Sequence, residues 1–238
     1  MKDVFGQTLL SYWQGDHKTP CNIKRGDGRI DGGSLKNYFR KYSQFSNIEK
    51  RALKHVGGKV LDAGCGAGRH ILYLQKKGFD VLGIDESPLA TKVCKERGCK
   101  KVKVMDIFKP KLKANTFDTI ILFGNNLGIG GTLKGVKKLL KILRKLAKKD
   151  GTLLLNSIDV KVTKDRSHIN YRQRNLKQGK YIGALKIRIE YKNLIGEWFK
   201  WINVEPKILK HLASKSGWEI KKIYKGKQGN YSAVLKAI

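Results

Sequence analysis

Residues 59–85 constrain the fold more than any other stretch, because a buried-strand pattern there runs into a glycine-rich turn. The apolar residues of 60–63 predict a short strand. Three glycines follow at alternate positions: Gly64, Gly66 and Gly68. Residues 69–77 mix apolar and basic side chains, which predicts a helix that Gly78 ends. A second apolar run at 81–84 predicts another strand.

The three glycines and the acid that follows the second strand predict a nucleoside pocket. A side chain at Gly64, Gly66 or Gly68 would hold a ligand away from the backbone and would penalise the positive φ angles that such turns need. Asp85 stands at the tip of the second strand, 21 residues after Gly64. A carboxylate at that place is positioned to accept two hydrogen bonds from a ribose diol.

The glycine spacing indicates which nucleoside the pocket takes. A dinucleotide fold has the spacing G-x-G-x-x-G, which rests a pyrophosphate on a helix N-terminus. Here the spacing is G-x-G-x-G, and the negative charge of Asp62, just before it, would repel a phosphate. An acid suits a cationic ligand. S-adenosylmethionine fits, because it carries a sulfonium and an ammonium but no phosphate.

The motifs resemble those of the class I S-adenosylmethionine-dependent methyltransferases. Residues 60–68, with the sequence VLDAGCGAG, match the first motif of that family. Further matches follow in the right order: Asp85 after the second strand, Asp106 after the third, and the segment 117–122, FDTIIL, as the fourth strand. A nucleotide-binding dehydrogenase, or a glycine-rich turn without a ligand, is the alternative. The resemblance spans residues 34–238.

The resemblance implies an α/β fold with a Rossmann-like, seven-stranded, mostly parallel sheet, helices on both faces and an antiparallel β insertion after the fifth strand. It implies that Asp62 and the glycines hold the methionine end, that Asp85 holds the ribose, and that Asp106 accepts a bond from the adenine amino group. The cofactor-binding residues expected on this basis are Tyr38, Arg40, Asp62, Ala63, Gly64, Cys65, Gly66, Gly68, Asp85, Glu86, Asp106, Ile107, Gly124 and Asn125.

In the family, a helix at residues 34–56 lies over the cofactor, and an aromatic or arginine side chain on it often touches the methionine end. Tyr38, Arg40 and Tyr42 are the candidates for that contact. Core packing, or a solvated cation for Arg40, is the competing interpretation for each of them. Ser34 is expected to cap this helix, which is expected to break near Ser46.

The residues expected to face the methyl acceptor follow the fourth strand and lie in the insertion. The (N/D)-P-P-(Y/F) tetrapeptide of nucleic-acid amino methyltransferases is missing there. The segment 124–127, Gly-Asn-Asn-Leu, instead resembles the Gly-Asn-Ser segment of methyltransferases that act on small amines. Asn125 is expected to contact the cofactor through its amide and Asn126 to orient the acceptor, with helix capping as the alternative. The catalytic candidates are Asn126, His168 as a general base, and Tyr171.

The chain is expected to divide into an N-terminal leader or lid, residues 1–33, and a methyltransferase domain, residues 34–238. Residues 14–33 hold many glycines and predict a loop. Residues 160–204 form the expected substrate-side β insertion, with one strand at 184–191 and a partner at 198–204. A basic amphipathic helix is expected from 132 to 149, and the fifth strand from 152 to 158.

The charge is unusual: 51 Lys and Arg residues stand against 19 Asp and Glu residues, a formal net charge of +32. A thermophile surface would pair extra lysine with extra glutamate, and glutamate is scarce here. Such a field attracts polyanions, including RNA. A drift of composition toward lysine, with no partner, is the equal alternative because the lysines are spread along the chain.

The four cysteines, at positions 21, 65, 94 and 99, form no pattern with zinc spacing, so we expect reduced thiols and no metal site. The longest apolar run, 120–123, is far too short to cross a bilayer. The N-terminal residues show no signal-peptide core. We therefore expect a cytoplasmic protein that needs no membrane; the sequence does not indicate its oligomeric state.

These features together predict an S-adenosylmethionine-dependent methyltransferase. A small-molecule or protein side-chain acceptor is favoured by the segment 124–127 and by the insertion, which suggests an enclosed pocket. An RNA methyltransferase is favoured by the charge, although no RNA-binding module is recognisable. A non-catalytic scaffold that binds the cofactor is the third interpretation, and the intact acids at 62, 85 and 106 argue against it.

Overall fold

The computed structural model describes residues 3–238, and these form two compact units. Unit 1 holds the described residues through Phe45, together with Gly58–Lys111 and Lys186–Phe199. Unit 2 holds Ser46–Gly57, Leu112–Leu185 and Lys200–Ile238. The glycine-rich turn therefore belongs to unit 1 and the 124–127 segment to unit 2.

The secondary-structure elements of unit 1 surround the glycine-rich turn. Its helices are α1 Val4–Trp13, α2 Lys36–Phe39, the 3-10 helix η1 Tyr42–Gln44, α4 Arg69–Lys76 and α5 Pro88–Glu96. Its strands are β1 Cys21–Arg25, β2 Ile30–Gly33, β3 Val60–Ala63, β4 Val81–Asp85, β5 Val102–Val104 and β9 Leu194–Ile195, with most of β8 Ala184–Tyr191.

The elements of unit 2 include those on either side of the segment 124–127. Its helices are α3 Asn47–Leu53, the 3-10 helix η2 Asn126–Gly130, α6 Leu133–Leu146, α7 Arg166–Lys177, α8 Pro206–Ser214 and the 3-10 helix η3 Lys227–Gly229. Its strands are β6 Phe117–Leu122, β7 Ala147–Ile158, β11 Trp218–Lys225 and β12 Asn230–Ala237, with most of β10 Phe199–Ile202.

The main sheet has seven strands in the order β11-β12-β7-β6-β3-β4-β5. In unit 1, β3 pairs with β4 and β4 with β5, both in parallel. In unit 2, β6 pairs in parallel with β7, whereas β12 runs antiparallel to β7 and β11. The predicted seven-stranded, mostly parallel α/β sheet is confirmed. Because the carboxyl ends of parallel strands carry the ligand-binding loops in such folds, candidate binding residues are those that follow β3 and β4 in unit 1 and those that follow β6 in unit 2.

The glycine-rich stretch 14–33 is not a loop, as its composition predicts, but contains the hairpin of β1 and β2. These strands belong to a second sheet in the order β10-β8-β1-β2, with β9 paired to β8. Ile23 of β1 lies opposite Ile189 of β8, so the pairing that stabilises β1 comes from a distant part of the chain. All four residues of the edge strand β2 are exposed, which explains why no apolar pattern marks it.

The expected helix at 34–56 is divided into α2, η1 and α3. Ser46 caps α3, since its side chain accepts a hydrogen bond from the Glu49 backbone, which confirms the expected break. Ser34 does not cap α2, because the cap position is Leu35 and no side-chain bond is made there. The insertion 160–204 contains the predicted strand β8, and β10 lies where its partner strand was predicted, next to β8 in the second sheet. The insertion also contains the helix α7 and the short strand β9, which pairs antiparallel with β8; neither was predicted.

Helix α6 shows why its amphipathic sequence pattern is structural. Thr132 caps its start through the Gly135 backbone, and its apolar stripe is buried while most of its basic residues are partly or fully exposed. The buried residues are Val136, Leu139, Leu140, Leu143 and Leu146. The helix ends at Leu146, because β7 already begins at Ala147 and bends at Asp150, whose φ is +61°. Over the described residues, no helix is both long and apolar enough to span a membrane.

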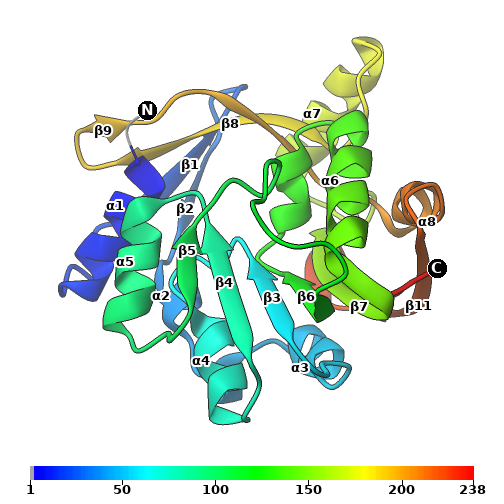
Figure 1. The fold of residues 1–238 in the computed structure, drawn as a ribbon. Helices are drawn as coiled ribbons and strands as arrows, with labels where there is room; N and C mark the ends of the chain where they lie inside the picture. Colours follow the sequence, from blue (N-terminus) through cyan, green and yellow to red (C-terminus); the bar gives the residue numbers. More distant parts are fainter. Residues whose placement is uncertain (1–2) are drawn as a thin grey trace. The chain divides into compact units, whose positions relative to one another are not determined.

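The N-terminal helix α1 is packed into unit 1. It contacts α5, and the two lie side by side in Figure 1. Its buried Leu9 and Leu10 join an apolar cluster with Ala67 of the glycine-rich turn and Val93 of α5. The Asp3 carboxylate accepts hydrogen bonds from the Gly6 backbone at 2.8 Å, the Ser87 hydroxyl at 2.6 Å and the Leu89 backbone at 3.2 Å. The division into a leader, 1–33, and a domain, 34–238, stays a prediction.

Candidate cofactor and acceptor sites

The turn between β3 and α4 needs glycine for two different reasons. Gly66 has a φ of +53°, and a Cβ built there would lie 3.5 Å from the Tyr38 ring, which is ordinary contact. Gly68 has a φ of +77°, and a Cβ there would lie 2.9 Å from the Cys94 sulfur and closer still to that of Cys99. Gly68 is therefore required for packing, whereas Gly66 leaves its backbone bare beside Tyr38.

Three buried thiols support this turn from inside unit 1. The Cys94 sulfur lies 3.0 Å from the Gly66 carbonyl oxygen, to which its S–H donates, and 3.9 Å from the Cys65 sulfur. The Cys99 sulfur lies 3.8 Å from the carbonyl oxygen of Gly68. The hydrogen bond with Cys65, together with burial, raises the pKa of the Cys94 thiol, so this sulfur stays protonated and keeps donating.

Arg97 of α5 ties the same turn to α2. Its guanidinium donates to the Ala67 carbonyl and, at 3.4 Å, to the Tyr38 carbonyl. The same group lies 4.7 Å from the centre of the Phe39 ring. Because one cation holds both segments, the position of Tyr38 relative to the glycines is fixed inside unit 1.

Asp62, in β3, is the most unusual carboxylate of unit 1. It is 1% exposed, and its Oδ2 atom is buried without a hydrogen-bond partner among the described residues. The pKa of Asp62 is raised to about 7, mainly by burial. The Arg69 guanidinium partly opposes this rise and the Asp85 charge adds to it, and the value includes both effects. Buried polar atoms are almost always hydrogen-bonded, so an orphan carboxylate oxygen indicates a place for a cationic ligand.

Asp85, at the end of β4, fixes the turn and keeps free capacity. Its Oδ2 accepts a hydrogen bond from the Gly66 backbone at 2.9 Å, and its Oδ1 accepts one from the Ser87 backbone at 3.0 Å. Burial raises the pKa of this carboxyl group. Each carboxylate oxygen can accept a second bond, which is the pair that a ribose diol would donate.

The other predicted cofactor residues of unit 1 lie in three places. Glu86 follows Asp85 and is exposed, and so is Asp106 after β5, whose Oδ1 accepts from the Phe108 backbone at 2.7 Å. Ile107 is 8% exposed and fits the expected pocket wall. Ala63 ends β3, and with Gly64 and Cys65 it completes the motif strand and turn.

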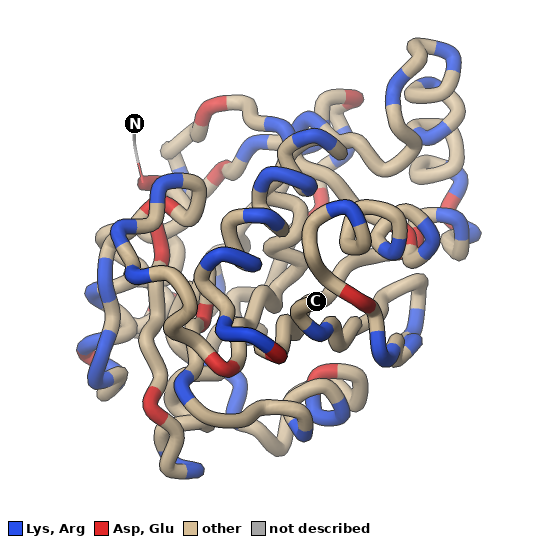
Figure 2. Tube along the Cα trace, turned by 45° about the vertical axis from the view of Figure 1, so that its right-hand side comes forward, with Lys and Arg blue, Asp and Glu red and all other residues tan. Residues whose placement is uncertain are grey.

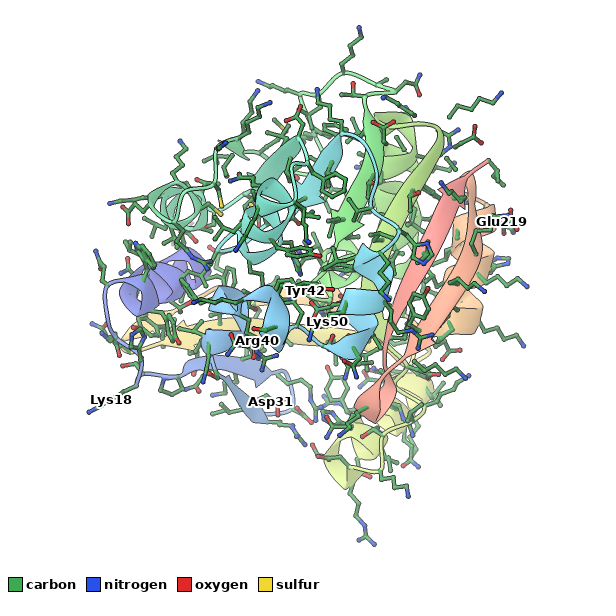
Figure 3. The ribbon with its side chains drawn as sticks, turned by 90° about the horizontal axis from the view of Figure 1, so that it is seen from below. Lys18, Asp31, Arg40, Tyr42, Lys50 and Glu219 are labelled. Carbon is green, nitrogen blue, oxygen red and sulfur yellow. The ribbon has the colours of Figure 1, made fainter. Side chains whose placement is uncertain are left out.

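Tyr38 and Arg40 lie on α2 and at its end. Burial raises the pKa of Tyr38 to about 12, and its ring makes an edge contact with Phe5, with the ring centres 5.3 Å apart. Arg40 is half-buried at the C-terminal end of α2 (Figure 3). Tyr42, the third candidate, stacks on Tyr73 of α4 with the ring centres 4.1 Å apart, so its ring is engaged in packing.

On the acceptor side, in unit 2, Asn125 is held by two other asparagines. Its backbone N–H donates to the Asn156 side chain at 2.7 Å, and its Nδ2 donates to the Asn203 side chain at 2.7 Å. Its φ is +61°, an uncommon value for a residue with a side chain. It occupies the position before η2, but its side chain makes no capping bond there.

The remaining acceptor-side candidates belong to the same unit. Gly124, with a φ of +75°, precedes Asn125, and a Cβ on Gly124 would lie 3.5 Å from the Asn126 side-chain oxygen. His168 and Tyr171 lie one turn apart on α7, where both are half-buried. The Asp165 carboxylate caps this helix by accepting from the backbones of Ser167 and His168.

Four residues that organise these sites were not predicted from the sequence: Arg69, Arg97, Asn156 and Asn203. A signal existed for Asn156, because it is a polar residue that directly follows the apolar residues 153–155 of a predicted buried strand. No local signal marks the other three. Among the described residues, no group of His, Cys, Asp and Glu side chains is arranged to hold a metal ion.

The fold and the β3–α4 turn define a Rossmann-like methyltransferase. The model of the family described as "Methyltransferase domain" matches residues 54–216, and the chain belongs to this family of class I S-adenosylmethionine-dependent methyltransferases.

Known structures and proteins are similar to the chain. A S-adenosylmethionine-dependent methyltransferase from Bacteroides fragilis, solved with S-adenosyl-L-homocysteine, is 29% identical with a TM-score of 0.85, over 99% of this chain and 95% of that one. A methyltransferase structure from Methanosarcina mazei, 19% identical with a TM-score of 0.64 over 82% and 98% of the two chains, shares the fold.

One curated relative also matches, a Geobacillus sp. (strain WCH70) protein that is provisionally named a methyltransferase. The two are 26% identical over 136 residues. The matched part covers 54% of this chain, and the chain spans about half the length of this relative, 54%. Neither this relative nor the two structures carries a named acceptor in its description.

Proposed function

We propose that this protein transfers a methyl group from S-adenosylmethionine to a small-molecule or protein side-chain acceptor. The observation that supports this most is Asp62, a buried carboxylate with an orphan oxygen beside a bare glycine turn. The ammonium of the methionine part would supply the missing partner. The complex of the Bacteroides fragilis relative with S-adenosyl-L-homocysteine supports the same cofactor.

The residues of unit 1 would hold the cofactor as follows. Asp62 would bind the ammonium, and the bare backbone of Gly64 and Gly66 would lie against the methionine part. Asp85 would accept the two ribose hydroxyls with its free lone pairs, since its other bonds already go to Gly66 and Ser87. The exposed Asp106 would accept a bond from the adenine amino group, with Ile107 as the apolar wall beside it.

When bound, the sulfonium supplies a strongly electrophilic methyl group. The protein therefore mainly has to align the acceptor lone pair with that methyl group and exclude water. Asn125 or Asn126 would orient the acceptor. His168 and Tyr171 are our candidates for proton transfer, a function that a hydroxyl acceptor needs more than an amine does. The insertion 160–204 would build the acceptor pocket, and the proposed location is the cytoplasm.

An RNA acceptor is the second candidate, and the net charge of +32 favours it. Figure 2 shows Lys and Arg residues along the whole trace instead of in a single stripe. A diffuse coat of this kind gives binding by counterion release, which fades as salt rises. This distribution supports the small-molecule or side-chain acceptor over RNA.

Calorimetry tests the cofactor, and label transfer tests the acceptor. We expect heat with S-adenosylmethionine and S-adenosylhomocysteine and none with NAD; tight NAD binding without the former two would refute the proposal. Methyl-labelled S-adenosylmethionine in a cell extract, fractionated into RNA, protein and small molecules, should label the small-molecule or protein fraction. Label only in RNA would establish the second candidate, and binding without any label would indicate a non-catalytic protein.

A further inference from the structure

The Asn125 side chain has a buried oxygen that none of the described residues meets with a hydrogen bond. Its backbone N–H is used by Asn156 and its Nδ2 by Asn203, both at 2.7 Å. Its Oδ1 is buried without a hydrogen-bond partner among the described residues. A buried amide oxygen in that state needs a donor, because an unmet acceptor loses its bond to water and gains nothing in return.

Asn203 determines which atom of the Asn125 amide is left free. The Asn203 Oδ1 atom accepts from Asn125 Nδ2, and an amide turned by half a rotation would bring two oxygens together. With Asn203 Oδ1 as the acceptor, the Asn125 amide is oriented so that its own Oδ1 is the atom without a partner among the described residues. The bond to Asn203 Oδ1 is what distinguishes the oxygen of the Asn125 amide from its nitrogen.

The segment that carries Asn203 is itself fixed. Its backbone N–H donates to the Gly183 carbonyl at 2.9 Å, and the next residue, Val204, donates to the Ser157 hydroxyl at 3.0 Å. The Tyr231 hydroxyl donates to the Val204 carbonyl at 2.6 Å. Asn203 is 9% exposed, so it presents its oxygen from a pinned and buried position.

The backbone of Asn125 is also constrained. Its φ of +61° lies in the left-handed region, and the bond from its backbone N–H to Asn156 of β7 helps to hold it there. The next turn, η2, is packed against β10, because any Cβ on Gly128 would run into the Trp201 ring. Strained backbone, an oriented amide and an orphan oxygen thus coincide on one residue.

We infer that Asn203 is a positioning residue that turns the Asn125 carbonyl oxygen toward the N–H group of an amine methyl acceptor. This inference rests on the proposed function and adds the acceptor class. The acceptor nitrogen would keep its lone pair free while Asn125 Oδ1 holds one N–H. The N–CH₃ bond forms as the sulfonium S–CH₃ bond breaks, the electron pair goes to sulfur, and the extra proton on nitrogen leaves to water.

The test compares Asn203→Leu with Asn203→Asp. Leucine removes the oxygen that holds Asn125 Nδ2, whereas aspartate keeps an acceptor in the same place. Thr119→Val is the matched control: Thr119 is a buried polar residue of the same unit, outside the insertion 160–204 and 1% exposed, whose hydroxyl donates to the Gly57 carbonyl at 2.8 Å. The probe is methyl-labelled S-adenosylmethionine with a desalted small-molecule extract, separated by cation exchange into amines and the rest.

The wild type should label the amine fraction. Asn203→Leu should lose about tenfold or more in transfer rate, the effect of about 1.4 kcal/mol, with S-adenosylhomocysteine affinity within twofold of wild type. Asn203→Asp should restore at least half of the rate. Thr119→Val should transfer normally even if its denaturation midpoint falls as far as that of Asn203→Leu.

Two results would overturn the inference while leaving the proposed function standing: a wild-type rate in Asn203→Leu, or label only in compounds without an N–H group. A loss in Asn203→Leu that Thr119→Val reproduces would show a purely structural role and would also overturn it. Bound cofactor with no label from the wild type would remove the proposed function, and the inference with it.

Discussion

The β3–α4 turn of unit 1 and the β6–η2 turn of unit 2 solve the same structural problem with different chemistry. Both follow a buried parallel strand, and both contain residues with positive φ. The first uses glycines and carboxylates, and it leaves an orphan anion on Asp62. The second uses asparagines, and it leaves an orphan neutral oxygen on Asn125. Charge and bare backbone suit binding a cationic cofactor, whereas a neutral, oriented amide suits alignment.

The largest effect should come from Gly66→Ala, which tests whether the first turn depends on bare backbone. The new Cβ would stand between the turn and its ligand, on a backbone with φ of +53°. We expect S-adenosylhomocysteine affinity to fall about 100-fold, equivalent to about 2.8 kcal/mol. Calorimetry measures it.

Gly78→Ala is the control for that substitution, because Gly78 has a φ of +86° and nothing lies within 4 Å of its Cβ position. It should lose about 1 kcal/mol of stability and keep its affinity. Equal affinity losses in the two variants would show that backbone strain, and not ligand access, governs the turn.

Asp62→Asn should weaken cofactor binding about tenfold at pH 8 and stabilise the fold by about 1–3 kcal/mol, because it removes a buried unpaired charge. The Asp62 pKa is raised from 3.8 to about 7. Because the pKa of Asp62 is higher in the folded state, its contribution to the stability of the fold is full below pH 3.8 and is lost as pH rises toward 7. Over the same range the carboxylate ionises, so cofactor affinity should grow.

The pH series provides the control for Asp62. At pH 5 the wild-type carboxyl is mostly protonated, so wild type and Asp62→Asn should bind S-adenosylhomocysteine with similar affinity. Denaturation and calorimetry from pH 5 to 8 measure both curves. A wild-type affinity that does not change between pH 5 and 8 would contradict the charge-based half of the comparison.

Asn125→Gly and Asn125→Ala sharpen the other half. Both remove the orphan oxygen, so we expect methyl transfer to fall about tenfold in each. Only alanine keeps the strain of a positive φ, and it should be less stable than the glycine variant by about 1–2 kcal/mol. Labelled transfer and denaturation measure the two effects. Transfer at the wild-type rate in the glycine variant would remove the amide from the reaction.

Cys94→Ala should have the smallest effect. Cys94 supports the Gly66 carbonyl from below, and a weak S–H donor is worth a fraction of an ordinary hydrogen bond, so we expect a two- to threefold loss of affinity. Cys21→Ala, another buried thiol of unit 1, should leave affinity unchanged. Cys94→Ser restores a donor and should recover binding. An unchanged affinity in Cys94→Ala would show that the thiol only fills space.

The sequence was most informative where local pattern and burial agree. The strand at 117–122 was predicted at the bounds that the structure has, because its last three residues, 120–122, are apolar and buried and Phe117 at its start is buried as well. The strand β7 was predicted to start at 152 but starts at Ala147, since its first residues are basic, partly exposed and interrupted by the bend at Asp150.

Long-range pairing explains what local pattern missed. The hairpin of β1 and β2 reads as a loop by composition, and its stability depends on β8, more than 150 residues later. The candidate sites show the same division. The acids and glycines stand in one motif, whereas Asn156 and Asn203 reach Asn125 from 31 and 78 residues away. Spacing along the chain carries no trace of such contacts.

The bonds of Asp3 have a consequence for how unit 1 comes apart. One carboxylate closes the first turn of α1 and the first turn of α5, two helices that begin more than 80 residues apart. Loss of the Asp3 carboxylate would leave the first turns of α1 and α5 without these hydrogen bonds at the same time, so we expect the two helices to unfold together. Removal of Asp3 would then destabilise α5, and with it the contacts that Cys94 and Arg97 make with the glycine-rich turn.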